Sequence, residues 1–169
     1  MATPASGAAK SMCRPSTAAR LDIMELFARY SWSYDCSDAV GAAACFAEDA
    51  VIEAFGKETA RGREAIVRFI AGLYESVRGD LVWQHHNEHF IFDGDDEACT
   101  VYCYTTILEQ DPETQEYSVY NFGFYRTECR NFDGEWLITR RSINRWNRDR
   151  LPWAGLRPKS NGAASRRPA

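Results

Sequence analysis

The sequence predicts an α+β fold in which helices pack on one curled antiparallel sheet. The first eighty residues contain three stretches whose apolar side chains recur with helical spacing. The residues after Gly79-Asp80 contain four long stretches rich in β-forming residues and separated by short turns. Helices followed by strands are typical of α+β domains. A length of 169 residues with 45% hydrophobic content is sufficient for one domain with a core.

Caps and turns set the boundaries of these elements. Ser16 or Thr17 can cap the first helix, because a hydroxyl oxygen accepts a hydrogen bond from a free N–H of the first turn. Asp93-Gly94 and Asp133-Gly134 are typical of hairpin turns. The predicted helices span residues 16–35, 38–46 and 63–77, and the predicted strands span residues 50–55, 81–92, 98–109, 117–130 and 135–146.

The two ends of the chain differ from its body. Residues 1–15 are small and poor in acids, which predicts a disordered N-terminal segment, and residues 151–169 form a basic tail rich in Gly, Ala, Ser and Pro. Residues 16–150 are the predicted domain. Because the formal net charge is −4 and many cations lie at the ends, the body is acidic, which argues against a nucleic-acid partner.

Membrane and metal sites are not expected. The chain has no apolar run of about eighteen residues and no apolar signal-peptide core, so we expect a cytoplasmic protein without a membrane partner. None of the six cysteines forms a CxxC pair, and most lie in apolar patterns. We therefore expect buried free thiols rather than disulfides or zinc ligands. The cysteines are Cys13, Cys36, Cys45, Cys99, Cys103 and Cys129.

The candidate catalytic residues are Tyr30, Asp35 and a histidine, His85 or His86. Tyr30 and Asp35 lie near the end of the first predicted helix, and a cluster on the second predicted strand contains all three histidines of the chain. A base, a carboxylate that orients it and a phenol can together move protons on a small molecule. Since side chains alternate along a strand, only one of His85 and His86 can share the face of the carboxylate.

Several strings resemble the SnoaL-like branch of the nuclear transport factor 2-like superfamily, over roughly residues 18 to 147. Each string is weakly specific, but their order and spacing together are typical of the fold. The strings are Arg29-Tyr30 followed by Asp35, Cys45-Phe46-Ala47-Glu48-Asp49-Ala50-Val51, Gly62-Arg63-Glu64-Ala65-Ile66, His85-His86 ahead of Phe92-Asp93-Gly94-Asp95, Gly123-Phe124-Tyr125, and Asp133-Gly134-Glu135-Trp136-Leu137-Ile138. The resemblance implies a cone-shaped, cystatin-like α+β barrel with an open mouth, commonly a homodimer or homotrimer.

Within that superfamily, the chain resembles the scytalone dehydratase and bile-acid 7α-dehydratase group. Members carry a tyrosine on the first helix, an aspartate five residues later and a histidine on a strand, as Tyr30 and Asp35 are placed here. The resemblance implies that a His–Asp pair removes a proton next to a carbonyl or a leaving group, and that no metal or organic cofactor takes part.

Two departures limit the resemblance. The histidine of the relatives lies further upstream of the Asp-Gly hairpin, so an even gap selects His85 and an odd gap or a bulge selects His86. In addition, the bile-acid enzyme has an aspartate on the following strand, where Thr106 stands here. The identity of the base and the reaction therefore stay open.

The substrate is expected to be small, hydrophobic and cyclic or polycyclic, because 13% of the residues are aromatic and pockets for such ligands are mostly apolar. The residues expected to bind it are Tyr34, Tyr104, Phe122, Phe124, Asn144 and Trp146.

Three functions fit these residues. The first is a cofactor-independent dehydratase, a lyase that acts on a hydroxy-ketone. The second is an isomerase or cyclase of the polyketide, terpenoid or steroid type that uses the same base. The third is a non-catalytic small subunit or ligand-binding module of a ring-hydroxylating dioxygenase, in which Asp35 would pair with an arginine such as Arg29 or Arg126.

Overall fold

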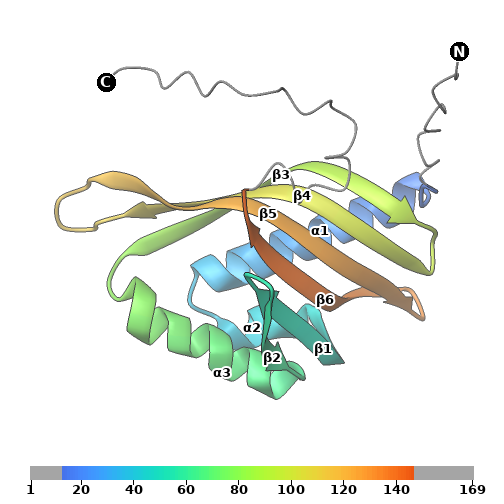
Figure 1. Cartoon of the computed structure of the whole chain (residues 1–169), viewed down its shortest axis with the longest axis horizontal. Helices are drawn as coiled ribbons and strands as arrows, with labels where there is room; N and C mark the ends of the chain where they lie inside the picture. The colour runs from blue at the N-terminus through green and yellow to red at the C-terminus, as the bar shows by residue number, and fades with distance from the viewer. Residues whose placement is uncertain (1–12, 147–169) are drawn as a thin grey trace, which may run out of the picture.

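A computed structural model describes residues 13–146 of the chain (Figure 1). The predicted N-terminal segment and basic tail therefore lie almost entirely outside the described residues. The helical elements are α1 Thr17–Asp35, α2 Ala39–Ala44, α3 Arg63–Leu73 and the π-helix η1 Tyr74–Arg78. The strands are β1 Phe46–Ala54, β2 Lys57–Arg61, β3 Val82–Gly94, β4 Ala98–Gln110, β5 Tyr117–Phe132 and β6 Glu135–Arg145.

Helix α1 begins where the sequence predicts. The Ser16 hydroxyl caps it by accepting a hydrogen bond from the Ala19 N–H at 3.2 Å. Apolar side chains at intervals of three and four residues are buried along one side of the helix, and they include Ile23, Leu26, Phe27, Tyr30 and Tyr34. This apolar side fixes which residues of α1 point to the sheet, and so orients the last turn of the helix.

The six strands form one sheet in the order β2-β1-β6-β5-β4-β3. The cystatin-like α+β fold is confirmed, with the helices packed on a curled sheet. Two details differ from the expectation. Strand β1 pairs with β6 in parallel, so the sheet is mixed. Strand β6 lies beside β1 only after the chain has passed through the β3–β5 meander. The sheet is also open, since β2 and β3 are edge strands that are not neighbours in it.

Two local elements also differ from the prediction. Strand β2, which was not expected, pairs with β1 through a tight turn at Phe55-Gly56. The third helix is α-helical only to Leu73 and continues as the π-helix η1. A π-turn widens the helix locally, and such turns are frequent at functional sites.

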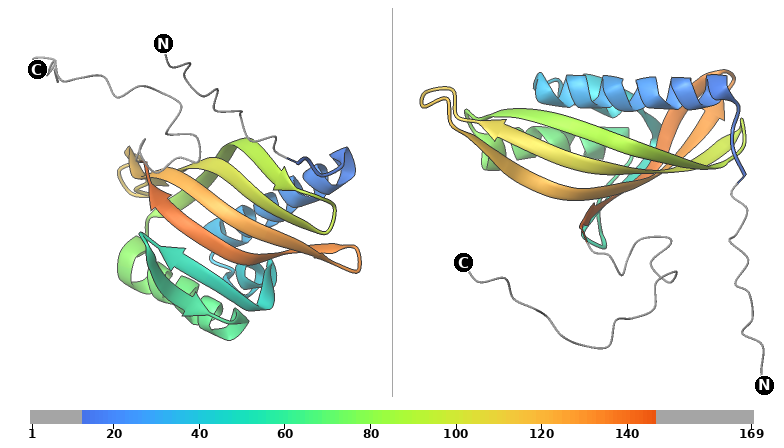
Figure 2. Two further views of the ribbon diagram at one scale, coloured as in Figure 1. Left: turned by 45° about the vertical axis from the view of Figure 1, so that its right-hand side comes forward. Right: turned by 90° about the horizontal axis from the view of Figure 1, so that it is seen from above.

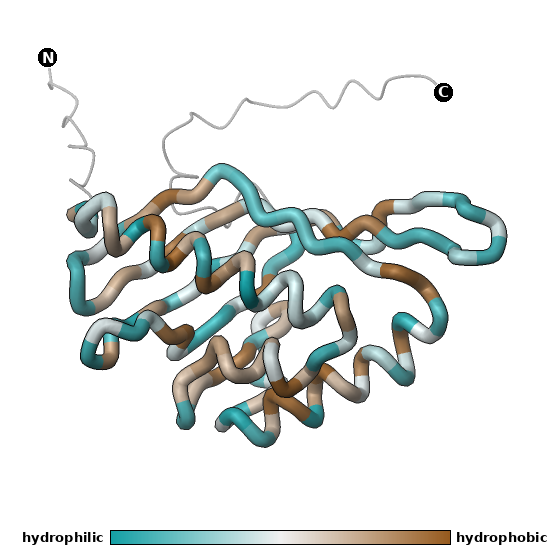
Figure 3. The backbone as a smooth tube through the Cα atoms, turned by 180° about the vertical axis from the view of Figure 1, so that it is seen from behind, coloured by the Kyte–Doolittle hydropathy of each residue, from teal (hydrophilic) through white to brown (hydrophobic). Residues whose placement is uncertain are grey.

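Helix α1 lies along the concave side of the sheet, and α3 lies beside the β1–β2 hairpin (Figures 1 and 2). The β4–β5 hairpin projects beyond the rest of the sheet, and its tip is hydrophilic (Figure 3). No helix within residues 13–146 combines the length and apolar character needed to cross a membrane. All six cysteines are free, and the buried ones are Cys45, Cys99, Cys103 and Cys129, whereas Cys13 and Cys36 are exposed.

Candidate active site

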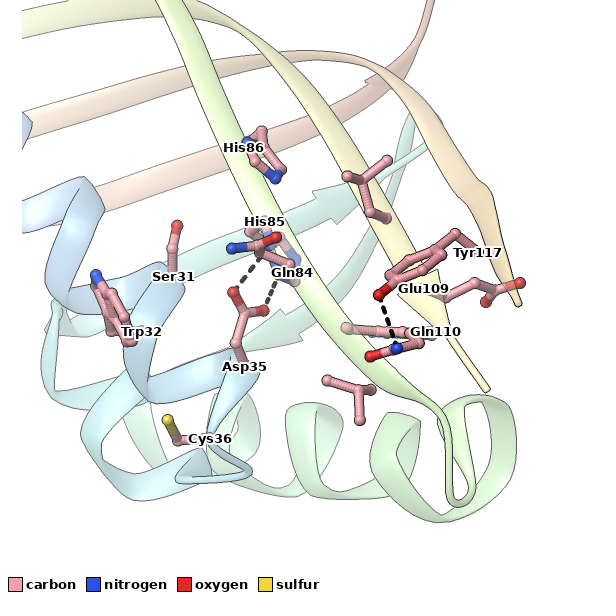
Figure 4. A pocket seen from close by; sticks show the side chains of 13 residues that line it. Ser31, Trp32, Asp35, Cys36, Gln84, His85, His86, Glu109, Gln110 and Tyr117 are labelled. Atoms are coloured by element: carbon pink, nitrogen blue, oxygen red, sulfur yellow. Dashed lines mark hydrogen bonds and ion pairs between the residues drawn. The ribbon is translucent and has the colours of Figure 1, made fainter. Parts of the chain in front are cut away.

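Asp35, the last residue of α1, is hydrogen-bonded to His85 on β3, the second predicted strand. The Nδ1 atom of His85 lies 2.5 Å from Oδ1 of Asp35, and the backbone N–H of His85 donates to Oδ2 at 2.8 Å (Figure 4). One carboxylate therefore holds both the ring and the backbone of His85. The side chain of His85 is only 2% exposed and that of Asp35 is 16% exposed, so the pair is largely removed from water.

A second contact fixes the helix against the strand. One helical turn before Asp35, the Ser31 hydroxyl accepts a hydrogen bond from the Asn87 side-chain amide at 2.8 Å. Asn87 shares the face of His85, two residues along β3. The two polar contacts set the position of α1 along β3, and hence the geometry of the Asp35–His85 pair.

The carboxylate sets the tautomer of His85. Since an ionised carboxylate can only accept, Nδ1 carries the hydrogen of the short contact, and Nε2 is left unprotonated in the neutral ring. Nε2 is therefore the nitrogen that can take a proton from a bound molecule. The carboxylate also stabilises the imidazolium that forms when it does so.

His85 forms part of the wall of an aromatic cavity of about 480 Å³. The Tyr34 ring centroid is 4.7 Å from that of His85, and the Tyr30 centroid is 6.3 Å from it. Trp83 stacks on Tyr34 and on Tyr120, which extends the aromatic wall toward β5. The lining residues are Tyr30, Tyr34, Ala54, Phe55, Phe69, Leu73, Trp83, His85, Ile107, Tyr120, Asn121, Tyr125, Ile143 and Arg145.

The two tyrosines beside His85 keep their protons. Burial raises the pKa of Tyr30, and the nearby Arg141 guanidinium partly opposes this rise. Burial also raises the pKa of Tyr34, with further contributions from the surrounding phenols. Both side chains are therefore neutral hydrogen-bond donors near neutral pH, not phenolate bases.

Sequence reasoning missed one residue near this site, Arg141 of β6. It is fully buried, with its guanidinium carbon 4.3 Å from the Tyr30 ring centroid and 4.5 Å from that of Phe27. Its Nε donates to Thr127 at 3.3 Å, and it forms no ion pair with a carboxylate among residues 13–146. A buried cation is costly unless it is compensated, and aromatic ring faces surround this one, so a positive charge lies behind Tyr30.

A parity change along β6 was the signal that could have identified Arg141. Trp136 and Ile138 indicate that even-numbered residues point inward, whereas Ile143 indicates odd-numbered ones. The two agree only if a bulge lies between them, and the structure has an irregularity there, with Cys129 opposite Ile138 and Glu128 opposite Arg140.

A second hollow lies on the other side of the Asp35–His85 pair. It has a volume of about 530 Å³, and both members of the pair contribute to its wall (Figure 4). Trp83 and His85 line both hollows, whereas Asp35 lines only the second. The pair thus stands between the aromatic cavity and a groove at the β3 edge of the sheet.

His86 and Thr106 do not reach the aromatic cavity. They are opposite each other on the outer face of β3 and β4, and His86 lies apart from the Asp35 carboxylate (Figure 4). Thr105, which is fully buried, faces inward instead of Thr106. The structure thus brings together Tyr30, Asp35 and His85.

Of the six residues expected to bind substrate, only Tyr34 lines the aromatic cavity. The other five lie on the convex face, because the inward residues of β4 and β5 are Cys103 and Tyr125, one position away from the expected ones. The side chains of the convex cluster contact one another, with the Trp146 ring near those of Tyr104 and Phe122. These five residues are Tyr104, Phe122, Phe124, Asn144 and Trp146.

Neither a metal cluster nor an arginine partner of the Asp35 carboxylate is found within the described chain; Arg78 donates only to the backbone carbonyl of Asp35, at 3.4 Å. No three His, Cys, Asp or Glu side chains of residues 13–146 converge to hold a metal ion. Arg126 pairs with Glu128 at 2.6 Å, and the side-chain contacts of Asp35 are those with His85.

Solved structures share this fold. An NTF2-like protein with a cystatin-like fold from Novosphingobium aromaticivorans matches with a TM-score of 0.69 and 23% identity, over 82% of this chain and 88% of that one. Aln2 from a Streptomyces species matches with a TM-score of 0.71 and 20% identity, over 79% and 94%. A protein from Catenulispora acidiphila in complex with S-DNPA matches with a TM-score of 0.67 and 22% identity, over 76% and 95%.

At these identities the structural matches establish the fold alone. No curated protein sequence matches the chain. The model of the SnoaL-like domain matches residues 15–142, which is most of the sequence. That family includes polyketide cyclases and dehydratases. The extent of the match shows that this chain belongs to the SnoaL-like family.

Proposed function

We propose that the protein is a cofactor-independent dehydratase that acts on a small cyclic or polycyclic hydroxy-ketone. The observation that carries this proposal is His85 in the wall of an aromatic cavity, held by the Asp35 carboxylate behind it and with Tyr30 and Tyr34 beside it. A carboxylate-oriented imidazole next to neutral phenols supplies a base and hydrogen-bond donors for one substrate.

Each residue has a defined role in the proposed reaction. Nε2 of His85 takes the proton from the carbon next to the ketone, and the electron pair moves into the carbonyl to give an enolate. The Tyr30 phenol donates a hydrogen bond to the enolate oxygen, and Arg141 stabilises this charge from behind the phenol. The enolate then expels hydroxide from the next carbon, which leaves as water with the proton from His85.

The cavity supports a flat, apolar substrate. Its wall is made mostly of aromatic and aliphatic side chains, and stacked rings such as Trp83 and Tyr120 present planar surfaces. Its volume of about 480 Å³ lies within the range of pockets for small molecules.

A racemic β-hydroxy-ketone, 3-hydroxy-1-tetralone, tests the reaction directly. Loss of water from this compound gives an enone that tautomerises to 1-naphthol, which mass spectrometry and fluorescence detect. Formation of 1-naphthol by the wild type, and not by a His85→Gln variant, is expected. A second assay follows deuterium uptake by 1-tetralone in D₂O, which requires proton removal but no leaving group. If the wild type is inactive in both assays, or the variant equals it, the proposed chemistry is wrong.

An isomerase or cyclase would use the same His85 base. In that reaction the proton returns to another atom of the substrate, and the product keeps the mass of the substrate. Deuterium uptake by 1-tetralone without dehydration of the hydroxy-ketone would favour this alternative.

We further propose that the protein is a homo-oligomer that uses the convex face of its sheet. Phe122 is 59% exposed there and contacts Trp146, and clustered exposed aromatic side chains are typical of interfaces. Sedimentation equilibrium is expected to give a mass above 19.2 kDa, and a Phe122→Glu variant is expected to be monomeric.

A further inference from the structure

Within residues 13–146, Arg145 is a cation without an ion-pair partner at the edge of the aromatic cavity. It is the last residue of β6, its side chain is exposed, and it belongs to the cavity wall. Its guanidinium carbon lies 4.8 Å from the ring centroid of Phe55. Arg145 has no carboxylate partner within residues 13–146. Stacking on a ring occupies the face of a guanidinium and leaves the N–H groups at its edge free to donate.

The charge on the cavity wall is of one sign. Within the described chain, no Asp or Glu lines this cavity, and Arg145 is its one permanently charged lining residue. The protein as a whole has a formal net charge of −4, which disfavours anions in general. A local cation beside an acid-free aromatic wall is therefore a specific attraction for one anionic group. Asn121 also lines the cavity and offers an additional amide donor.

Phe55, whose ring lies under Arg145, has an unfavourable backbone conformation. Phe55 has a φ of 54°, a left-handed value that is an outlier for a bulky side chain. Its N–H donates to the Ile143 carbonyl at 2.9 Å, which ties the β1–β2 turn to β6. Phe55 and Gly56 both have positive φ, as a two-residue hairpin turn requires, so the turn itself fixes the position of the Phe55 ring beside Arg145.

The base and the cation stand on strands that are not neighbours. His85 is on β3 and Arg145 is on β6, with β4 and β5 between them. Three strand spacings amount to about 14 Å along the sheet, and less across its curve. A molecule that contacts both residues must therefore be about as long as two or three fused rings.

We propose that the substrate carries a carboxylate on the ring furthest from its reacting carbon, and that Arg145 binds this carboxylate. The inference rests on the proposed function, because it takes His85 as the reacting end of the cavity. Arg145 then selects acidic polycyclic substrates over neutral ones and sets the direction in which they enter.

The test compares two probes of the same shape. Isothermal titration calorimetry gives the affinity of 6-hydroxy-2-naphthoate and of its neutral amide, 6-hydroxy-2-naphthamide. Wild-type protein is expected to bind the carboxylate about tenfold more tightly, which is typical of a charge-assisted hydrogen bond. Arg145→Gln is expected to remove this preference, and Arg145→Lys to retain part of it. Added NaCl is expected to weaken binding of the carboxylate alone.

Arg130→Gln is the matched control. Arg130 also stands over an exposed ring, with its guanidinium carbon 5.6 Å from the Phe132 centroid, but neither residue lines the cavity. This variant is expected to keep the wild-type preference. Equal affinity of the wild type for the two probes, no binding of either, or a preference that survives in Arg145→Gln would overturn the proposal.

The two proposals fail in different ways. If the carboxylate preference depends on Arg145 but the wild type exchanges no protons of 1-tetralone, the anion site stands and the proposed reaction does not. If exchange depends on His85 while the two naphthalene probes bind equally, the reaction stands and the anionic substrate class does not.

Discussion

Two pairs of neighbouring residues, His85-His86 on β3 and Arg140-Arg141 on β6, place chemically identical side chains on opposite faces of the sheet. His85 and Arg141 point to the concave face, and His86 and Arg140 point to the convex face. His85 is bonded to Asp35, and Arg141 is surrounded by aromatic rings. Arg140 instead forms an ordinary half-exposed ion pair with Glu53.

The comparison shows that residue type does not decide which side chain can act on a substrate. The face of the strand decides it, because the concave side places the hydrogen-bonded His85 in the wall of an apolar cavity. In such surroundings hydrogen bonds and charges are stronger than at the surface. Substitutions at matched positions of the two faces therefore test this distinction.

The largest difference is expected between the two histidines. His85→Gln removes the proposed base and is expected to slow deuterium uptake by 1-tetralone about 10²- to 10⁴-fold. His86→Gln changes a side chain on the other face and is expected to keep the rate within about twofold. Nuclear magnetic resonance of the ketone measures both rates. Equal losses in the two variants would show that the face of β3 does not select the base.

Removal of the carboxylate is expected to have the next largest effect. In Asp35→Asn, the side-chain NH₂ group can take the place of the oxygen that Nδ1 needs, so the imidazole adopts the wrong tautomer. We expect a rate about 10²-fold lower at saturating 1-tetralone. Asp22→Asn, an exposed change on the same helix, serves as the control. A wild-type rate in Asp35→Asn would mean that Asp35 only anchors the helix.

The two arginines are expected to differ in stability as well as in rate. Arg141→Met removes a buried charge and fills its volume, which is expected to raise the free energy of unfolding by about 1 kcal/mol or more. The same variant is expected to slow proton exchange, because the charge behind Tyr30 is lost. Arg140→Met is expected to lower stability slightly and leave exchange unchanged. Urea titrations and the exchange assay distinguish the two; a large loss of stability in Arg141→Met would assign that residue a structural role.

The smallest effect concerns buried thiols on the concave side of β4 and β5. Burial raises the pKa of Cys103 and of Cys129 to about 12, from an ordinary value of 9.0. Above pH 9 the unfolded chain loses thiol protons that the folded chain keeps. This contribution to stability is complete below pH 9 and is lost as the pH rises toward 12.

Urea unfolding at pH 8 and pH 10 tests this contribution. Each of the two thiols is expected to account for about 1 kcal/mol of the decrease. Cys103→Val and Cys129→Val are therefore expected to show smaller decreases than the wild type, and Cys36→Ala, at an exposed position, to show the same decrease. A wild-type decrease in both valine variants would refute the assignment.

Local chemistry explains why the sequence predicted most of the elements. The cap at Ser16 and the Asp-Gly turns act over a few residues, so they can be recognised without knowledge of the fold. The same holds for Tyr30 and Asp35, whose places on α1 follow from helical spacing. Strand β2 was missed because its few residues, mostly exposed, show no apolar alternation.

Long-range strand pairing explains which features could not be predicted from the sequence. Which of His85 and His86 faces the helix depends on the register of β3, and the strand has an irregularity between Glu88 and Ile91. The expected pocket residues on β4 and β5 lie on the other face of the sheet, because the same one-residue uncertainty in register applies to these strands. Arg141 was missed because a bulge changes the parity of β6 before it.

The parallel contact between β1 and β6 has a consequence for how the chain reaches its native state. These strands are separated by the length of most of the domain, so their pairing closes a long loop and is expected to be slow. During synthesis, the edge of β1 that pairs with β6 stays uncovered until β6, the last strand, has been made. Ile143 and Arg145 also come from that strand, so the cavity wall is completed only after the rest of the domain has been made.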